Sequence, residues 1–290
     1  LALRPALVSA GKVLAAAMLC AFASGAQETD AMKLPAQLAG AFAITALCTR
    51  DVSSMIGLAR ETVTKLSDFT ALLLPVLSSS LAASGGSVSA GALLAGGSFA
   101  MSLLTKLASG VLIPLVYVFV LLSAAECATD GGGLGKIRAL GGRAISLLIK
   151  GLCAVFTAYL SLSRVLTGSA DAFALKAAQA AFSGMVPVVG SMLSDASESL
   201  LASAGLIRSA AGAFGILAVI SMAIVPFLRL GAYYLALKLA GAIGEGAVMK
   251  PHAALLSNLA SAMGYMLAIA ASALWMSLVS AACFLKAVNG

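Results

Sequence analysis

Long apolar segments recur from one end of this chain to the other, and they constrain its fold more than any other feature. They lie near residues 5–24, 35–49, 69–84, 88–104, 107–125, 144–163, 172–190, 209–228, 231–243 and 253–285. Only 10% of the residues are charged, against about 25% in soluble domains. Because a spanning helix needs about 20 residues, we predict about six to eight true spans. The shorter segments are then re-entrant, interfacial or halves of broken helices.

The predicted fold class is all-α, a polytopic transmembrane helical bundle. Open sheet edges cannot exist in lipid, and no barrel-like alternation is visible in the sequence. Gly and Ala are abundant while aromatic residues make up 6% of the chain. Small residues let membrane helices approach closely, so the composition favours a tightly packed bundle.

The N-terminal segment has two interpretations. Arg4 and Lys12 precede an apolar run that ends in Ala21-Phe22-Ala23, a pattern typical of a signal peptide. A first membrane helix fits the same residues, and we favour it. The chain begins with Leu rather than Met, so we expect it to be trimmed or processed.

The net charge of +7 comes largely from two basic segments, residues 126–150 and 229–250. An excess of Lys and Arg beside membrane helices predicts cytoplasmic loops that meet anionic lipid headgroups, and nucleic-acid binding is set aside. Charges are balanced in residues 50–68. That segment predicts either an amphipathic helix on the membrane surface or a helical connector.

Four prolines suggest an internal duplication. Pro75 and Pro114 lie 39 residues apart, as do Pro187 and Pro226, and an offset of 112 aligns the two pairs. Proline disrupts a helix, so all four are predicted helix breaks. Repeats with discontinuous helices are common in transport folds, and both copies precede a basic segment, which predicts parallel repeats. The expected organisation is residues 1–68, 69–150 (first repeat), 151–250 (second repeat) and 251–290.

Catalytic, cofactor and metal sites are not expected. The five cysteines are scattered without a CxxC, and His252 is the single histidine. The glycine-rich residues 131–136 resemble a phosphate-binding loop. However, Asp130 replaces the first required Gly and Ile137 replaces the Ser or Thr, so we expect a flexible cytoplasmic turn.

Asp171 and Lys176 are candidate intramembrane or interfacial charges. Buried in lipid, both would need partners. Three interpretations stay open: an amphipathic helix at the interface, an ion or proton path, and contact with partner subunits.

Residues 187–205 form a small, weakly polar stretch. On a helix, one face carries Ser191, Ser194, Asp195 and Glu198. The sequence predicts a discrete short helix, started by Pro187 and Gly190, with the two acids placed as in a capping box. The shared face either packs on another helix or faces a pore or partner.

The stretch from Gly168 to Gly215, together with residues 72–94, closely resembles the stage III sporulation protein AE family of endospore-forming bacteria. The resemblance covers residues 60–245 well. It implies a multi-pass protein of the mother-cell membrane around the forespore. It also implies a channel complex built with other proteins of the same operon and a forespore partner, which supports forespore gene expression. The family implies no catalytic residues.

The leading interpretation is therefore a non-enzymatic membrane subunit of a secretion-like channel, one that contacts lipid and forms homo-oligomers. The alternative is a stand-alone secondary transporter, favoured by broken-helix repeats and by Asp171 and Lys176 but opposed by the scarcity of buried charges. A membrane enzyme would need a convergent cluster of reactive groups, which the sequence does not offer.

Overall fold

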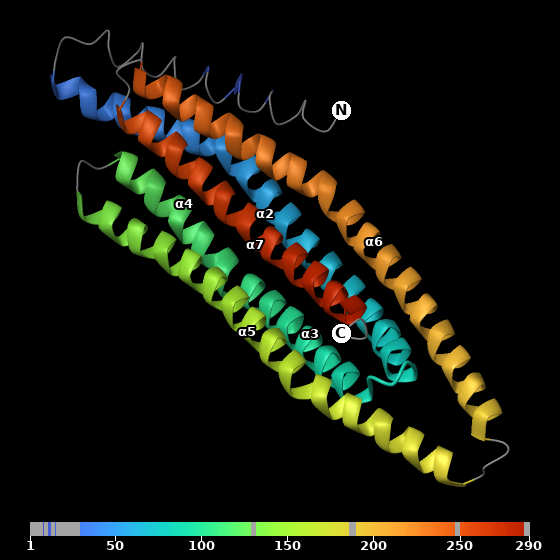
Figure 1. Cartoon of the computed structure of the whole chain (residues 1–290). Helices are drawn as coiled ribbons and strands as arrows, with labels where there is room; N and C mark the ends of the chain where they lie inside the picture. The colour runs from blue at the N-terminus through green and yellow to red at the C-terminus, as the bar shows by residue number, and fades with distance from the viewer. Residues whose placement is uncertain are drawn as a thin grey trace. The chain divides into compact units, whose positions relative to one another are not determined.

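A computed structural model describes the backbone of residues 30–128, 132–185, 190–246 and 250–286, with a few isolated N-terminal positions. Side chains are described for residues 50–127, 133–163, 209–243 and 253–285, with a few others near the N terminus. Every secondary-structure element in this part of the chain is a helix, which confirms the all-α prediction (Figure 1). The helices are α2 (Asp30–Ala83), α3 (Ser87–Leu107), η1 (Ala108–Leu112), α4 (Ile113–Ala128), α5 (Gly132–Met185), α6 (Gly190–Gly246) and α7 (Lys250–Lys286).

Five described stretches are long and apolar enough to cross a membrane. They are Arg50–Ala83, Ser87–Cys127, Gly133–Ser163, Ser209–Ile243 and Ala253–Leu285. The expected six to eight spans concern the whole chain, and the segments 5–24, 35–49 and 172–190 lie mostly outside the residues whose side chains are described. Other neighbouring apolar segments fuse. Residues 88–104 and 107–125 lie in the continuous helical run of α3, η1 and α4, and residues 209–228 and 231–243 both lie in α6. The predicted membrane helix or signal peptide at residues 4–23 lies outside the described residues.

A heptad seam organises α2. Its buried positions recur at alternating spacings of four and three, the pattern of left-handed helix packing. They are Val52, Ile56, Ala59, Val63, Leu66, Thr70, Leu73 and Leu77. This seam passes straight through residues 50–68, so that segment is a part of a long helix and not a separate surface helix.

The helix α7 is the most enclosed of the candidate spans. In its most apolar 18-residue stretch 56% is buried, against 22–39% in the corresponding stretches of the other four. One face follows the same four-three alternation, and it is rich in small residues towards its C-terminal end. Its buried positions are Leu256, Leu259, Met263, Met266, Ala270, Ala273, Ser277, Ser280 and Phe284. Small residues allow neighbouring backbones to approach, as the composition predicted.

The described prolines do not break helices. Pro75 lies inside α2 and Pro226 inside α6. Pro114 is the second residue of α4 and lies just after the π-helical turn η1, whose C-cap residue Ile113 donates its amide to the Ala108 carbonyl. A wider turn at this point makes room for the proline ring, which would otherwise clash with the carbonyl four residues earlier. Each proline removes one helical hydrogen bond, yet the helical backbone continues on both sides of Pro75 and Pro226. Pro187 lies outside the described residues.

The predicted duplication is not confirmed. Between Pro75 and Pro114 the chain reverses at a tight turn, where Gly85 adopts a φ of 96°. At the aligned offset this glycine becomes Ser197, which lies within the uninterrupted helix α6. Because α6 continues through Ser197, the second segment has no equivalent turn. A positive φ would also be costly at Ser197, which has a Cβ atom. The two segments therefore differ in path.

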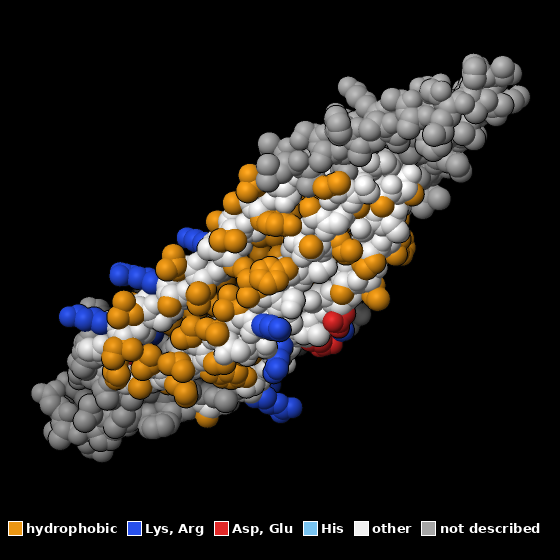
Figure 2. All heavy atoms as spheres, turned by 90° about the horizontal axis from the view of Figure 1, so that it is seen from below, with side chains coloured by type: hydrophobic (Ala, Val, Ile, Leu, Met, Phe, Trp, Pro, Cys, Tyr) orange, Lys and Arg blue, Asp and Glu red, His pale blue; other side chains and the backbone are white. Residues whose placement is uncertain are grey.

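The chain divides into two compact units. Unit 1 comprises residues 1–63, 106–150 and 223–271, and unit 2 comprises residues 64–105, 151–222 and 272–290. Each long helix contributes to both units. Figure 2 shows hydrophobic side chains over much of the described part of one molecular face, as expected of a surface that meets lipid or other subunits.

Candidate functional site

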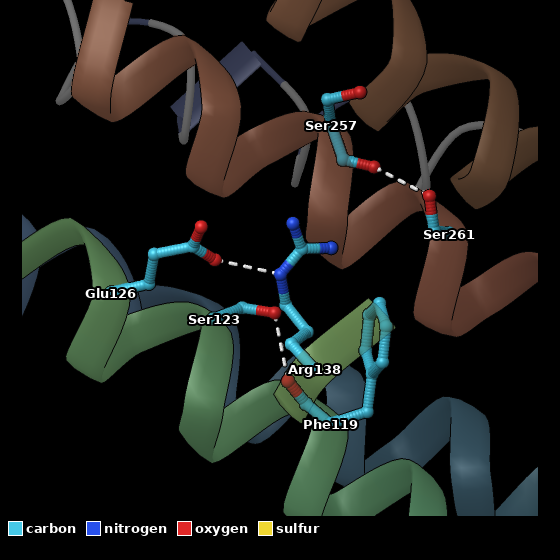
Figure 3. A network of polar contacts seen from close by, with 6 residues as sticks. All are labelled: Phe119, Ser123, Glu126, Arg138, Ser257 and Ser261. Atoms are coloured by element: carbon cyan, nitrogen blue, oxygen red, sulfur yellow. Dashed lines mark hydrogen bonds and ion pairs between the residues drawn. The ribbon is translucent and has the colours of Figure 1, made fainter. Parts of the chain in front are cut away.

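An ion pair fastens the hairpin formed by α4 and α5 in unit 1. Arg138 Nε donates to Glu126 Oε2 at 2.7 Å, with side-chain exposures of 21% and 30%. The Arg138 guanidinium also lies 5.5 Å from the centroid of the Phe119 ring. Figure 3 shows Arg138 reaching between these two α4 side chains. A cation that is held by both a carboxylate and a ring face fixes the register of the hairpin.

Two glycines let α5 approach its neighbours in this region. A Cβ atom at Gly135 would collide with the Glu126 carboxylate, and one at Gly142 would collide with the Tyr265 hydroxyl. The Tyr265 ring meets Phe119 edge-on, with the ring centroids 5.3 Å apart. The hairpin is thereby packed against α7.

Contacts between α6 and α7 complete unit 1. Lys238 Nζ donates to Ser257 Oγ at 3.2 Å. Close by, Gly241 meets the Ser257 backbone so tightly that an added Cβ would lie 3.2 Å from the Ser257 nitrogen. Ser257 and Ser261 appear on α7 in Figure 3, where the Ser261 hydroxyl donates to the Ser257 carbonyl. Polar contacts thus join α4 to α5 and α6 to α7, while the Phe119 and Tyr265 rings join the hairpin to α7.

Unit 2 is held by small residues and hydroxyl groups. Thr70 Oγ1 on α2 and Ser277 Oγ on α7 form a buried hydrogen bond of 2.8 Å, and Ser277 also contacts Met101 Sδ on α3 at 3.9 Å. In the same core, a Cβ on Gly97 would lie 2.8 Å from Leu74 Cδ1 and 3.4 Å from Ser280 Oγ. Three helices meet where only small side chains fit.

The helix α5 docks on this core through aromatic residues. Tyr159 Oη donates to the Ala92 carbonyl at 2.8 Å, and its ring covers Gly96, where a Cβ would overlap it. Phe156 meets Trp275 edge-on at 6.0 Å between centroids. These contacts connect α3, α5 and α7 without any charged group.

The described residues hold no cluster of three or more His, Cys, Asp or Glu side chains. Their buried polar groups are all hydroxyls: those of Thr62, Thr70, Ser78, Ser84, Ser89, Ser123, Ser163, Ser272, Ser277 and Ser280, and that of Tyr233. Hydroxyl groups of this kind bond to nearby carbonyls and strengthen helix packing in lipid.

Charge is distributed unevenly between the units. By sequence, unit 1 carries 13 of the 18 Lys and Arg residues and 7 of the 11 acids, so its formal net charge is +6 against +1 for unit 2. In unit 2, residues 69–105, 151–163, 209–222 and 272–285 contain no charged side chain. The hydrocarbon core of a membrane therefore fits unit 2 better than unit 1.

The two basic segments are mostly helical and not loops. Residues 132–150 belong to α5 and residues 229–246 to α6, so the connections shrink to residues 129–131 and 247–249. The expected turn at residues 131–136 is also helical from Gly132 onward. Within this helix, Gly135 lies close to the Glu126 carboxylate, where a Cβ atom would collide with it. Two helices that are able to cross a membrane, α5 and α6, separate the basic segments. Two successive crossings would return the chain to the same side, so this order of elements is compatible with the prediction that both basic segments face the cytoplasm.

The side chains of six candidate residues lie outside the described residues. They are Asp171, Lys176, Ser191, Ser194, Asp195 and Glu198. Their backbones belong to α5 and α6, and neither the pore nor the partner interpretation is tested.

The backbone of α6 does correct two expectations. The helix begins at Gly190 and continues for 57 residues, so residues 191–207 are not a discrete short helix. Asp195 therefore lies inside the helix and cannot be its N-cap, and the first turn contains no acid. An isolated glycine such as Gly205 costs only about 1 kcal/mol in a helix, too little to end a long one.

Lys106 and one exposed face of α5 carry cations that the sequence pattern did not single out. Lys106 is exposed near the middle of the apolar run Ser87–Cys127. On α5 the exposed residues Lys136, Leu140, Arg143, Leu147 and Lys150 recur at spacings of four and three. A Lys or Arg at a bilayer centre costs about 2.5–3.5 kcal/mol on insertion scales. These cations therefore mark helical positions outside the hydrocarbon core, and their regular spacing was visible in the sequence.

Comparison with known proteins identifies a family for this chain. The family model "Stage III sporulation protein AE" matches residues 9–287. A curated relative, stage III sporulation protein AE of Bacillus subtilis (strain 168), is 27% identical over 191 residues, which is 65% of this chain and 47% of the relative. The chain thus spans about half the length of that relative. No solved structure matches. Because the family match extends over nearly the whole chain, this multi-pass helical protein belongs to the stage III sporulation protein AE family.

Proposed function

We propose that the protein is a non-enzymatic subunit of a multiprotein channel between mother cell and forespore, located in the mother-cell membrane around the forespore. The family match over residues 9–287 carries this proposal. Other membrane proteins of the same operon and a forespore protein are its expected partners. Its task is then to shape and support the conduit and not to carry out chemistry.

The character of the helix interior supports a structural subunit over an ion-coupled transporter. Coupling to ions or protons uses intramembrane carboxylates, lysines or histidines. Among the described residues, the buried polar side chains carry hydroxyls and no charge, and several of them bond within the helices or between them. An interior of this kind favours a packed structural subunit over an ion-coupled one.

The extent of the apolar surface supports assembly with other subunits. The run Ser87–Cys127 has 41 residues, about 60 Å of helix, while the hydrocarbon core is about 30 Å thick. Two apolar side chains in different parts of this run are largely exposed: Phe99 is 70% exposed and Leu121 is 66% exposed. A single bilayer covers only half of such a helix, so protein neighbours are the natural cover for the rest.

Purification from sporulating cells tests the proposal. The tagged chain, extracted in a mild detergent, is expected to elute as an assembly well above dimer size, with its operon partners and with ring-like or tubular particles in electron micrographs. In cells lacking their own copy, the chain should restore a forespore reporter that is active after engulfment.

A monomer or dimer that moves solutes into liposomes without partners would favour the transporter. The matched control is the same preparation from cells that lack the other operon proteins. There, the large assembly should be lost while membrane insertion is unchanged. An assembly that persists in full without those proteins would contradict a multiprotein channel.

A further inference from the structure

The outer face of α5 in unit 1 is a basic seam. We define the α5 seam as Lys136, Leu140, Arg143, Leu147 and Lys150. All five side chains are exposed, and Leu140 and Leu147 are 62% and 73% exposed. Alternation of four and three residues places them on one stripe of the helix, the geometry of a coiled-coil contact.

The opposite face of α5 is already used. Gly142, Ile145 and Ile149 are buried within the molecule. Arg138 forms its ion pair with Glu126. No ion pair or hydrogen bond joins a seam cation to another side chain within the part of the chain that the structure describes. The seam is thus a second contact face and not an extension of the first.

Lipid cannot cover this seam. Three cations along one stripe exclude it from the hydrocarbon core, where each would need a partner. The headgroup region is also too thin. From Lys136 to Lys150 the stripe extends about 21 Å along the helix axis. Each headgroup layer adds only about 5–8 Å to the bilayer. Because α5 runs on into an apolar stretch able to cross the membrane, its axis cannot lie flat on the surface.

A second copy of the same face is excluded by charge. The seam carries three cations and no acid, and unit 1 as a whole has a formal net charge of +6. Two such faces would repel each other. Water is also a poor neighbour, since two largely exposed leucines lie between the cations.

We propose that the α5 seam docks an amphipathic α-helix of a partner protein, one with carboxylates that face the seam cations and apolar side chains that face Leu140 and Leu147. The acids give the charge complementarity that steers and aligns the helix. The leucines supply the apolar contact, as in helix-in-groove recognition. This surface stands on the geometry of α5 and does not depend on the channel function.

A designed peptide tests the docking on the full chain in nanodiscs of neutral phosphatidylcholine. The probe is a fluorescent 21-residue helix with Leu at alternating spacings of four and three and Glu beside them. Its control is a scrambled peptide of the same composition. We expect the designed peptide to bind at least tenfold more tightly than the scrambled one, because only the regular helix can align both contact types at once. Equal binding of the two peptides would overturn the proposal.

Variants separate the seam from general charge attraction. Charge reversal in K136E/R143E/K150E, and apolar truncation in L140A/L147A, should each weaken peptide binding at least tenfold. The matched control K106E/R229E reverses two exposed cations outside the seam and should change binding less than twofold. Loss of binding in the control to the same degree would refute a specific seam.

A photo-crosslinking residue at position 140 or 147 extends the test to sporulating cells. We expect one discrete protein adduct that disappears in K136E/R143E/K150E while membrane insertion stays normal. The same residue at position 217, where Leu217 is 67% exposed on an uncharged part of α6, serves as the control and should give lipid adducts. Lipid adducts alone at 140 and 147 would assign the seam to the membrane and overturn the proposal.

Discussion

Replacing Gly97 by alanine should destabilise unit 2, although alanine is the better helix former. The added Cβ would lie 2.8 Å from Leu74 Cδ1 and 3.4 Å from Ser280 Oγ. Leu74 is fully buried, so its side chain has no open space to move into. Overpacking of this kind costs about 1–3 kcal/mol, while the change from Gly to Ala gains about 1 kcal/mol in a helix. The expected net loss of stability is about 0–2 kcal/mol.

Gly91 on the same helix is the matched control, because nothing lies within 4 Å of its added Cβ. Gly91→Ala should therefore stabilise the protein by up to about 1 kcal/mol. The difference between the two variants isolates the overpacking term, about 1–3 kcal/mol. Unfolding free energies in mixed micelles, followed by near-ultraviolet circular dichroism, give both values.

A second substitution at Leu74 checks the cause. Leu74→Ala alone should cost about 2–5 kcal/mol because it opens a cavity. In Gly97→Ala/Leu74→Ala the new methyl group no longer meets the leucine, so the double variant should be at least about 1 kcal/mol more stable than the sum of the single changes predicts. Strict additivity, or a Gly97→Ala protein as stable as Gly91→Ala, would refute the packing argument.

Three further predictions concern charge and topology. Glu126→Gln should lower the free energy of unfolding by less than about 1 kcal/mol, because the partly exposed pair of Glu126 and Arg138 resembles a surface ion pair. A much larger coupling energy between the two residues in a double-mutant cycle would mean that the pair is effectively buried. Single cysteines in the two basic segments, in a background without the native five, should both resist an impermeant thiol reagent applied outside the cell; labelling of one and not the other would contradict their shared side. Asp195→Asn with Glu198→Gln should reduce channel assembly or forespore gene expression while insertion stays normal, and unchanged assembly and expression would leave these acids without a pore or partner role.

The sequence alone was sufficient for the fold class, since hydrocarbon leaves a backbone few options besides helices. It was also sufficient for the family, because the stretch from Gly168 to Gly215 is specific. It failed at helix boundaries. Proline was expected to break α2 and α6, yet both helices continue through Pro75 and Pro226, because one missing hydrogen bond does not end a helix of 54 or 57 residues.

Only the tertiary structure decided which residues face one another. Alternation of four and three on α2 was present in the sequence, but the burial of that stripe needs α7 beside it, as the bond between Thr70 and Ser277 demonstrates. Gly97 and Gly91 are the same residue type on the same helix, and the position of Leu74 is what leaves no room for a Cβ atom at Gly97. Arg138 and Arg143 likewise look equivalent in sequence, yet one pairs with Glu126 while the other is left on the outer seam. Local pattern determines that a helix forms and which faces are apolar or charged, whereas the partner of each face depends on neighbours that are distant in the chain.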